Sequence, residues 1–352
     1  MAVCEAGNDL ALGAPDPDAR RRRRLAWALA LLGALGLAAG LATGSNGFSP
    51  AGLLEELRGE QAGLILGEIR APRTLGAALV GALLGLGGAI AQGLFRNPLA
   101  DPYLLGAAAG AGLGVVGVLA GASLGGVVLS LATVAWLERV GLVAAAFGGA
   151  LAGVVLTLSL ARGALHTTRL LLSGVVVAVL LGAASDLLTV LSPDALRGKQ
   201  AFMLGSTSFI GWSALLLMAG GLALVLWLAL RLARALDALT LGEDSAASLG
   251  LDLARVRLVL VGLLSLGTAL AVSQAGLVAF VGLVAPHLVR RNAPGAHAWL
   301  LGASAAMGGV LLLGADVLSR ALIAPQELPV GVVTAVVGGL YLFLLLRRQG
   351  MS

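Results

Sequence analysis

The residue types that carry out chemistry in proteins are sparse in this sequence. It has one cysteine, Cys4, and three histidines that lie far apart along the chain, His166, His287 and His297. Zinc sites draw Cys and His ligands from short, regular spacings, so we expect no metal site. The single lysine, Lys199, lacks the rest of a G-x-x-x-x-G-K-[ST] phosphate loop. We therefore predict that the chain is not an enzyme, hydrolyses no ATP itself and binds no cofactor.

Three charged residues fall within long apolar runs, and they all lie toward the ends of those runs. Asp316 and Arg320 are four residues apart and can pair on one helix face. Asp186 could face an outer vestibule or contact a substrate. An ion-coupled carrier usually places ionisable groups in mid-membrane. No such relay is evident, which favours a transporter that draws its energy from a separate protein.

The composition indicates a membrane protein. Of 352 residues, 59% are hydrophobic and 12% are charged, and the mean hydropathy is +0.98. So few charges cannot cover a water-facing surface. Long apolar runs and 52 glycines favour closely packed helices over a β-barrel, so we predict an all-α membrane protein. The formal charge of +5 reflects arginines that flank membrane spans, and no nucleic acid binding is expected.

About ten apolar runs are long enough to cross a bilayer. They are 26–44, 74–95, 103–121, 140–162, 168–191, 211–233, 255–274, 276–290, 298–322 and 328–346. The run 276–290 is short, so we expect a partial or tilted helix there. Ser123 to Leu137 form an eleventh candidate. Arg20 to Arg24 precede a first run that is longer than a signal-peptide core, which predicts an uncleaved first span.

Positive charge decides between ten and eleven spans. With ten spans and the N-terminus inside, 16 of the 23 Lys and Arg residues are cytoplasmic, whereas eleven spans leave 10 inside and 13 outside. Positive residues favour the cytoplasm. We therefore predict ten spans with both termini cytoplasmic, an N-terminal tail over residues 1–24 and a single transmembrane domain over residues 25–348.

Glycines spaced four residues apart recur in these runs. They are Gly81 and Gly85; Gly106, Gly110 and Gly114; Gly117, Gly121 and Gly125; and Gly149 and Gly153. This spacing places small residues along one helix face, where a second helix can approach closely. We expect a tightly packed helical bundle.

Several longer motifs follow one another along residues 50–348. They are RAPRTL at 70–75, QGLFRNPLADP at 92–102, LLG at 104–106, LLLSGV at 170–175, LGED at 241–244, ASLG at 247–250, FVGLVAPH at 280–287, Ala315-Asp316 with Arg320, and ELPVGVVT at 327–334. In this order they resemble the FecCD-type permeases, which are the membrane subunits of ABC importers for ferric siderophores, haem and cobalamin.

The resemblance implies a type II ABC importer permease fold and a homodimer with a pore between the two copies. It implies two ATPase subunits on the cytoplasmic side, which hold ATP and Mg, and a periplasmic substrate-binding protein on the other side. The chain would lie in the cell inner (plasma) membrane. A stand-alone secondary, ion-coupled transporter is the alternative.

The resemblance also implies a coupling helix in the polar loop near residues 237–254, which would dock on the ATPase. The matched residues are Leu241, Gly242, Glu243, Ala247, Leu249 and Gly250. A plain solvated connector between two spans would have a similar composition.

Two further sites follow from the same resemblance. Arg70, Arg73 and Arg320 match arginines that receive acidic residues of the binding protein, and charge pairing of this kind fixes register. Arginines that snorkel toward the membrane interface are the alternative. Thr167 and Thr168 match a constriction at the cytoplasmic end of the pore, although threonines there could also cap a helix.

Overall fold

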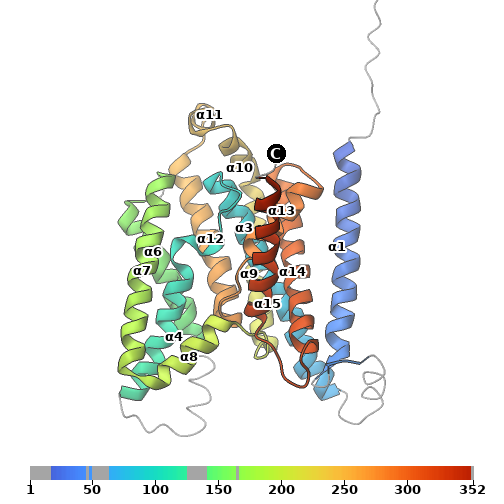
Figure 1. Cartoon of the computed structure of the whole chain (residues 1–352). Coiled ribbons are helices and arrows are strands. Elements are labelled where there is room, and N and C mark those ends of the chain that lie inside the picture. Colours follow the sequence, from blue (N-terminus) through green and yellow to red (C-terminus); the bar gives the residue numbers. More distant parts are fainter. Residues whose placement is uncertain (1–16, 45–46, 50–62, 125–140, 164–165, 350–352) are drawn as a thin grey trace, which may run out of the picture.

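The computed structural model describes residues 17–44, 47–49, 63–124, 141–163 and 166–349 (Figure 1). Its elements are α1 (Pro17–Ala42), β1 (Thr43–Gly44), β2 (Gly47–Phe48), the π-helix η1 (Gly63–Arg70), α3 (Ala71–Phe95), the 3₁₀ helix η2 (Pro102–Leu105), α4 (Ala107–Leu124), α6 (Leu142–Ala161), α7 (Thr167–Leu191), α8 (Pro193–Leu204), α9 (Trp212–Arg231), α10 (Ala233–Thr240), α11 (Glu243–Ser248), α12 (Leu253–Ala275), α13 (Val281–Asn292), α14 (His297–Ala321) and α15 (Val330–Gln349). The two short strands pair antiparallel. The all-α prediction is confirmed.

Each of the ten predicted spans coincides with a helix. These helices are α1, α3, α4, α6, α7, α9, α12, α13, α14 and α15. Among the described residues, seven helical segments are long and apolar enough to cross a membrane; they include all of these helices except α4, α13 and α15. Because α4 and α15 contain shorter apolar stretches and α13 has 12 residues, the count of ten stays a prediction. The eleventh candidate lies outside the described residues from position 125 onward.

The helices form a bundle with two ends (Figure 1). The "α11 end" carries α10 and α11, and α8 lies along the opposite "α8 end". Helix α1 begins and α15 finishes at the α11 end, as expected if both termini lie on one side of a membrane. Helix α8 was not predicted. Helix α1 begins at Pro17, so Arg20 to Arg24, which we assigned to the tail, belong to the helix.

Helix α3 lies at the centre of the bundle. Every residue from Val80 to Phe95 is buried, whichever face of the helix it occupies. A helix that is apolar all round is a buried helix. It packs against α9, α12, α13 and α14.

Glycines set the distance between α3 and α14. A Cβ atom added to Gly81 would lie 2.2 Å from the carbonyl oxygen of Gly308, and one added to Gly85 would lie 2.2 Å from that of Ser304. Real Cβ contacts are never this short, so the two backbones touch where no side chain intervenes. The predicted close packing is confirmed at this pair of glycines.

The α4–α6 contact is built in the same way. A Cβ on Gly110 or on Gly114 would lie 2.1 Å from a backbone oxygen, that of Gly149 or of Ala145. Gly117, in the next turn of α4, has no atom within 4 Å of such a Cβ. Spacing alone therefore does not identify a packing glycine.

We expect Gly114→Ala to destabilise the bundle by about 3 kcal/mol, because the clash is with backbone and only separation of α4 from α6 relieves it. Gly117→Ala, three residues away on the same helix, should be neutral or slightly stabilising, since alanine is the better helix former. The temperature at which the detergent-solubilised protein loses its gel-filtration peak measures both variants. Equal losses in the two variants would refute this account of the α4–α6 contact.

Candidate functional site

A cluster of paired charges lies at the α8 end, where α3 begins and α14 finishes. The carboxylate of Asp316 is fully buried between two guanidinium groups. Its Oδ2 lies 2.6 Å from Nη2 of Arg320, and its Oδ1 lies 3.3 Å from Nε of Arg73. The hydroxyl of Thr207 also donates to Oδ1. We call Arg73, Asp316, Arg320 and Glu327 the arginine–carboxylate cluster.

Arg320 connects α14 to the end of α1. Its side chain is 3% exposed, and Nη1 donates to the carbonyl oxygens of Gly40 at 2.9 Å and Thr43 at 3.0 Å. A cation placed at the C-terminal carbonyl groups of a helix also interacts favourably with the helix dipole. The predicted pairing with Asp316 is confirmed. Among the described residues Arg320 makes these internal contacts, and its role in docking a second protein stays a prediction.

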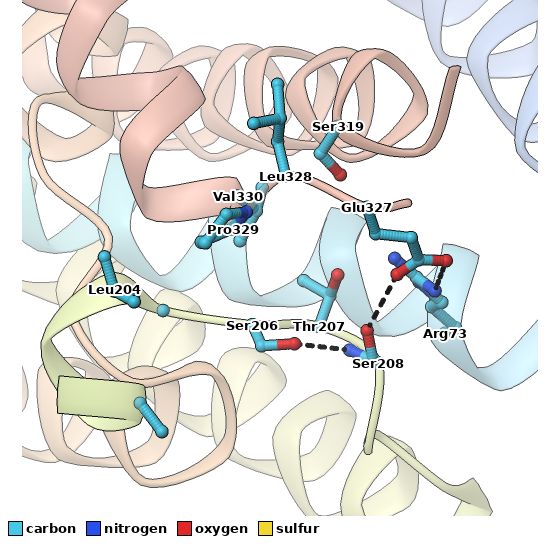
Figure 2. A pocket seen from close by; sticks show the side chains of 12 residues that line it. Arg73, Leu204, Ser206, Thr207, Ser208, Ser319, Glu327, Leu328, Pro329 and Val330 are labelled. Carbon is cyan, nitrogen blue, oxygen red and sulfur yellow. Dashed lines mark hydrogen bonds and ion pairs between the residues drawn. The ribbon is translucent and has the colours of Figure 1, made fainter. Parts of the chain in front are cut away.

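Glu327 forms the solvent-facing side of the cluster. Its Oε1 lies 2.9 Å from Nη1 of Arg73, and its Oε2 accepts a hydrogen bond from Ser208 at 3.3 Å. Figure 2 shows these three side chains directed toward one another beside a hollow of about 240 Å³. The hollow is lined by Arg73, Ala201, Leu204, Gly205, Ser206, Thr207, Ser208, Ser319, Glu327, Leu328, Pro329 and Val330. The lining combines polar side chains with apolar ones such as Leu204, Leu328 and Val330.

Arg70 lies next to the same cluster. Its Nη1 donates to the carbonyl oxygen of Leu41 at 3.0 Å, so it too holds the end of α1. Arg70 and Arg73 are thus together at the α8 end and make internal contacts. Their role in docking a second protein stays a prediction.

The predicted coupling loop forms two short helices at the α11 end (Figure 1). Gly242 and Gly250 bracket α11 with φ angles of +112° and +80°, which side chains with a Cβ rarely adopt. Leu241 and Leu249 are 70% and 66% exposed, and Ala247 is exposed as well, whereas Ala246 is fully buried. The loop therefore presents apolar side chains outward from a compact turn.

Ion pairs fasten this loop to the bundle. Glu243 lies 2.5 Å from Nη2 of Arg257 on α12 and 3.6 Å from Nη2 of Arg96, which follows α3. Asp237 on α10 lies 2.7 Å from Nδ1 of His297 at the start of α14. A solvated connector would not need such anchors. Glu243 is 38% exposed and its ion pair with Arg257 holds α11 in place, while its role in coupling to the ATPase stays a prediction.

Thr167 and Thr168 form the first turn of α7 at the α11 end. The N-cap position is held by His166, which makes no side-chain capping bond, so the structure gives the capping alternative no support. Thr168 lines an open hollow of about 490 Å³ together with Leu160, His166, Arg169, Leu172, Ser173 and Val176. The predicted role of the two threonines at a pore constriction between two copies stays a prediction.

Sequence reasoning missed several of these partners. Asp186 is 74% exposed and pairs with the single lysine, Lys199, on the unpredicted helix α8. Glu327 was part of a matched motif but had no assigned role. Its partner Arg73 lies 254 residues away along the chain, and no local spacing reveals such a contact. Within the described residues, no group of three His, Cys, Asp or Glu side chains is placed to hold a metal ion.

We expect Asp316→Asn to destabilise the protein by about 3 to 5 kcal/mol, because it leaves the buried guanidinium of Arg320 without its carboxylate partner and removes one of the two carboxylates of Arg73. Asp186→Asn makes the same chemical change in an exposed pair and should cost less than about 1 kcal/mol. Thermal unfolding in detergent, read by gel filtration, compares the two. Similar losses for both variants would show that the buried cluster contributes no more to stability than the exposed Asp186–Lys199 pair.

The Arg73–Glu327 pair should make stability depend on pH. Partial burial raises the pKa of the Glu327 carboxyl, but the hydrogen bond and charge of Arg73, aided by Ser208, outweigh this and lower the pKa below its ordinary value. The pair therefore stabilises the fold above the unfolded pKa of about 4.3, and this contribution is lost as pH falls through the folded-state value. We expect the unfolding temperature to fall as the pH drops from about 5 through the folded-state value, and to fall less in Glu327→Gln. An identical pH profile in that variant would assign the effect to other carboxyl groups.

Comparison with known proteins identifies the family that this chain matches. The model of the FecCD transport family matches residues 30–348. The hemin transport system permease protein HmuU of Yersinia pestis is 41% identical over 285 residues, which are 80% of this chain and 82% of that protein. The vitamin B12 import system permease protein BtuC of Klebsiella pneumoniae is 38% identical over 333 residues, covering 94% and 96% of the two chains.

Solved structures show the same architecture. A metal-chelate type ABC transporter in an inward-facing conformation superposes with a TM-score of 0.77 at 26% identity, covering 93% of this chain and 99% of the other. PsaBC from Streptococcus pneumoniae, at 15% identity and a TM-score of 0.51, shares the fold. The family match spans most of the chain, and the helices, the buried charge cluster and the anchored α10–α11 loop lie within it. This multi-pass membrane chain belongs to the FecCD transport family.

Proposed function

We propose that this chain is the permease subunit of an ABC importer in the inner membrane, working as a homodimer with two separate ATPase subunits and a periplasmic substrate-binding protein. The relatives named above transport hemin and vitamin B12, and both ligands are large tetrapyrrole–metal complexes. The cargo proposed here is of that size class: haem, a cobalamin or a ferric siderophore.

The α11 turn is the observation that carries this proposal. A soluble connector has no reason to expose Leu241 and Leu249 on a turn held in place by the Glu243–Arg257 ion pair. Exposed apolar side chains on a rigid support suit a contact with another protein. The ATPase subunit, which would bind ATP and Mg, is the partner proposed for this surface.

The opposite end would receive the binding protein. Arg70 and Arg73 lie there, and an acidic side chain of the incoming protein would reach Arg73 by replacing Glu327, which pairs with it on the solvent-facing side. Arg320 supports this surface from below through Asp316. Charge pairs at such a rim set orientation and encounter rate more than affinity.

The cargo would pass between two copies of the chain. Exposed apolar side chains continue along α7 and α15, which can face lipid or a second copy. Thr167 and Thr168, at the α11 end of α7, would form the constriction on the cytoplasmic side. Alternating access would come from rocking of packed helices around this path.

Reconstitution in liposomes tests the function. The chain is combined with its ATPase and with a binding protein loaded with hemin, cyanocobalamin or a ferric siderophore, and uptake is followed with ATP inside. We expect one of these ligands to be taken up, and we expect its uptake to require all three proteins. Uptake by the chain alone, driven by a proton or sodium gradient, would overturn the proposal in favour of a secondary carrier.

Leu249→Ala should weaken binding of the ATPase subunit roughly tenfold, because it removes apolar surface that the contact would bury. Leu35→Ala on α1 makes the same change at a similarly exposed leucine far from α11 and should leave that binding unchanged. Affinity is measured by biolayer interferometry with the permease in nanodiscs. If the two variants bind alike, α11 is not the ATPase contact.

A further inference from the structure

The first turns of α1 carry five consecutive arginines, Arg20 to Arg24, at the α11 end of the bundle (Figure 1). Because the segment is helical, these arginines divide between faces of α1. Arg22 lies beside the turn between α13 and α14, where a Cβ on Gly295 would be 3.0 Å from its Nη1. Arg21 lies 3.8 Å from Asp18. The remaining three arginines belong to another face.

That face points away from the bundle. Arg20, Arg23, Arg24 and Trp27 follow the i, i+3, i+4, i+7 spacing of a helix face and together line an open hollow of about 420 Å³. All four side chains are exposed, Trp27 by 68%. Three guanidinium groups and one indole ring therefore converge on a single surface.

The charge of this face has no internal counterpart among the described residues. Within the part of the chain that the structure describes, none of its three arginines makes an ion pair. Three acidic residues at the same end are engaged elsewhere: Asp237 with His297, Glu243 with Arg257 and Asp252 with Arg255. A helix N-terminus also carries partial positive charge, which disfavours arginines there. An external anion would relieve the repulsion among the three guanidinium groups and the repulsion between them and the positive end of the helix.

Below the arginines the same face becomes apolar. Leu31 and Leu35 follow Trp27 at intervals of four residues, and both are exposed. Cations come first, then an indole at the depth where Trp favours the membrane–water interface, then a stripe of leucines. This order matches an anionic headgroup followed by an acyl chain.

We propose that this face of α1 is a binding site for an anionic phospholipid. Arg20, Arg23 and Arg24 hold the phosphate of the headgroup, Trp27 packs at the glycerol level, and Leu31 and Leu35 contact an acyl chain. Guanidinium groups suit this ligand because they form charge-assisted, often bidentate hydrogen bonds with phosphate oxygens.

Native mass spectrometry of the purified full-length protein tests the site, using phosphatidylglycerol and phosphatidylcholine with identical acyl chains as probes. The unchanged protein should bind phosphatidylglycerol more tightly. Replacing Arg20, Arg23 and Arg24 together by Gln should weaken that binding by roughly fivefold for each arginine removed. The matched control replaces Arg21, Arg255 and Arg347 by Gln, which removes equal charge from the same end, and should change the affinity by less than about twofold.

A second variant separates a built site from diffuse attraction. Trp27→Ala keeps every charge and should still weaken phosphatidylglycerol binding about threefold, because the indole no longer covers the lipid. Equal weakening in the two triple variants, no preference between the two lipids, or full competition by inorganic phosphate would each overturn the proposal.

Discussion

Close backbone contact around α3 is the constraint on which the rest of this structure depends. Helices in a bilayer gain little by hiding apolar surface from one another, since lipid tails are equally apolar. What holds them is dense van der Waals contact, and glycine permits it. At the α3–α13 contact a Cβ on Gly88 would lie 1.7 Å from the carbonyl oxygen of Gly282. The glycines thus determine how near each neighbour lies to the central helix.

The interlocked pair of α3 and α14 joins the two ends of the molecule. At the α8 end, Arg73 of α3 and Asp316 of α14 form one ion pair. At the α11 end, Arg96, which follows α3, reaches Glu243 of α11, and His297 of α14 reaches Asp237 of α10. Both helices therefore contact the charge cluster at one end and the α10–α11 loop at the other. A relative shift of α3 and α14 cannot leave either surface unchanged.

The sequence predicted the long helices well because hydrophobic length is a local property. Helix α8 was not predicted, because its 12 residues mix Pro, Asp, Arg and Lys with apolar residues and are too few to span a membrane. Asp316–Arg320 was predictable since four residues separate its members on one helix. The pairing of Arg73 with Glu327 and of Glu243 with Arg257 depends on which helices meet in space. Local spacing does not reveal which helices meet, and this is why the internal partners of Glu243 and Arg73 were not predicted.

The arginine–carboxylate cluster also bears on how transport is energised. A carrier that exchanges an ion at a carboxylate needs that group to release its partners during each cycle. Asp316, the single acidic residue of α14, is fully buried and bound by two guanidinium groups and a hydroxyl. Releasing either arginine would leave a charge stranded in a low-dielectric interior, which is strongly unfavourable. Asp186, by contrast, is exposed and already paired with Lys199. Of the two acidic residues first considered for ion coupling, therefore, buried Asp316 is committed to structure and exposed Asp186 lies at the edge of the bundle. This arrangement favours energy supplied through the α11 end.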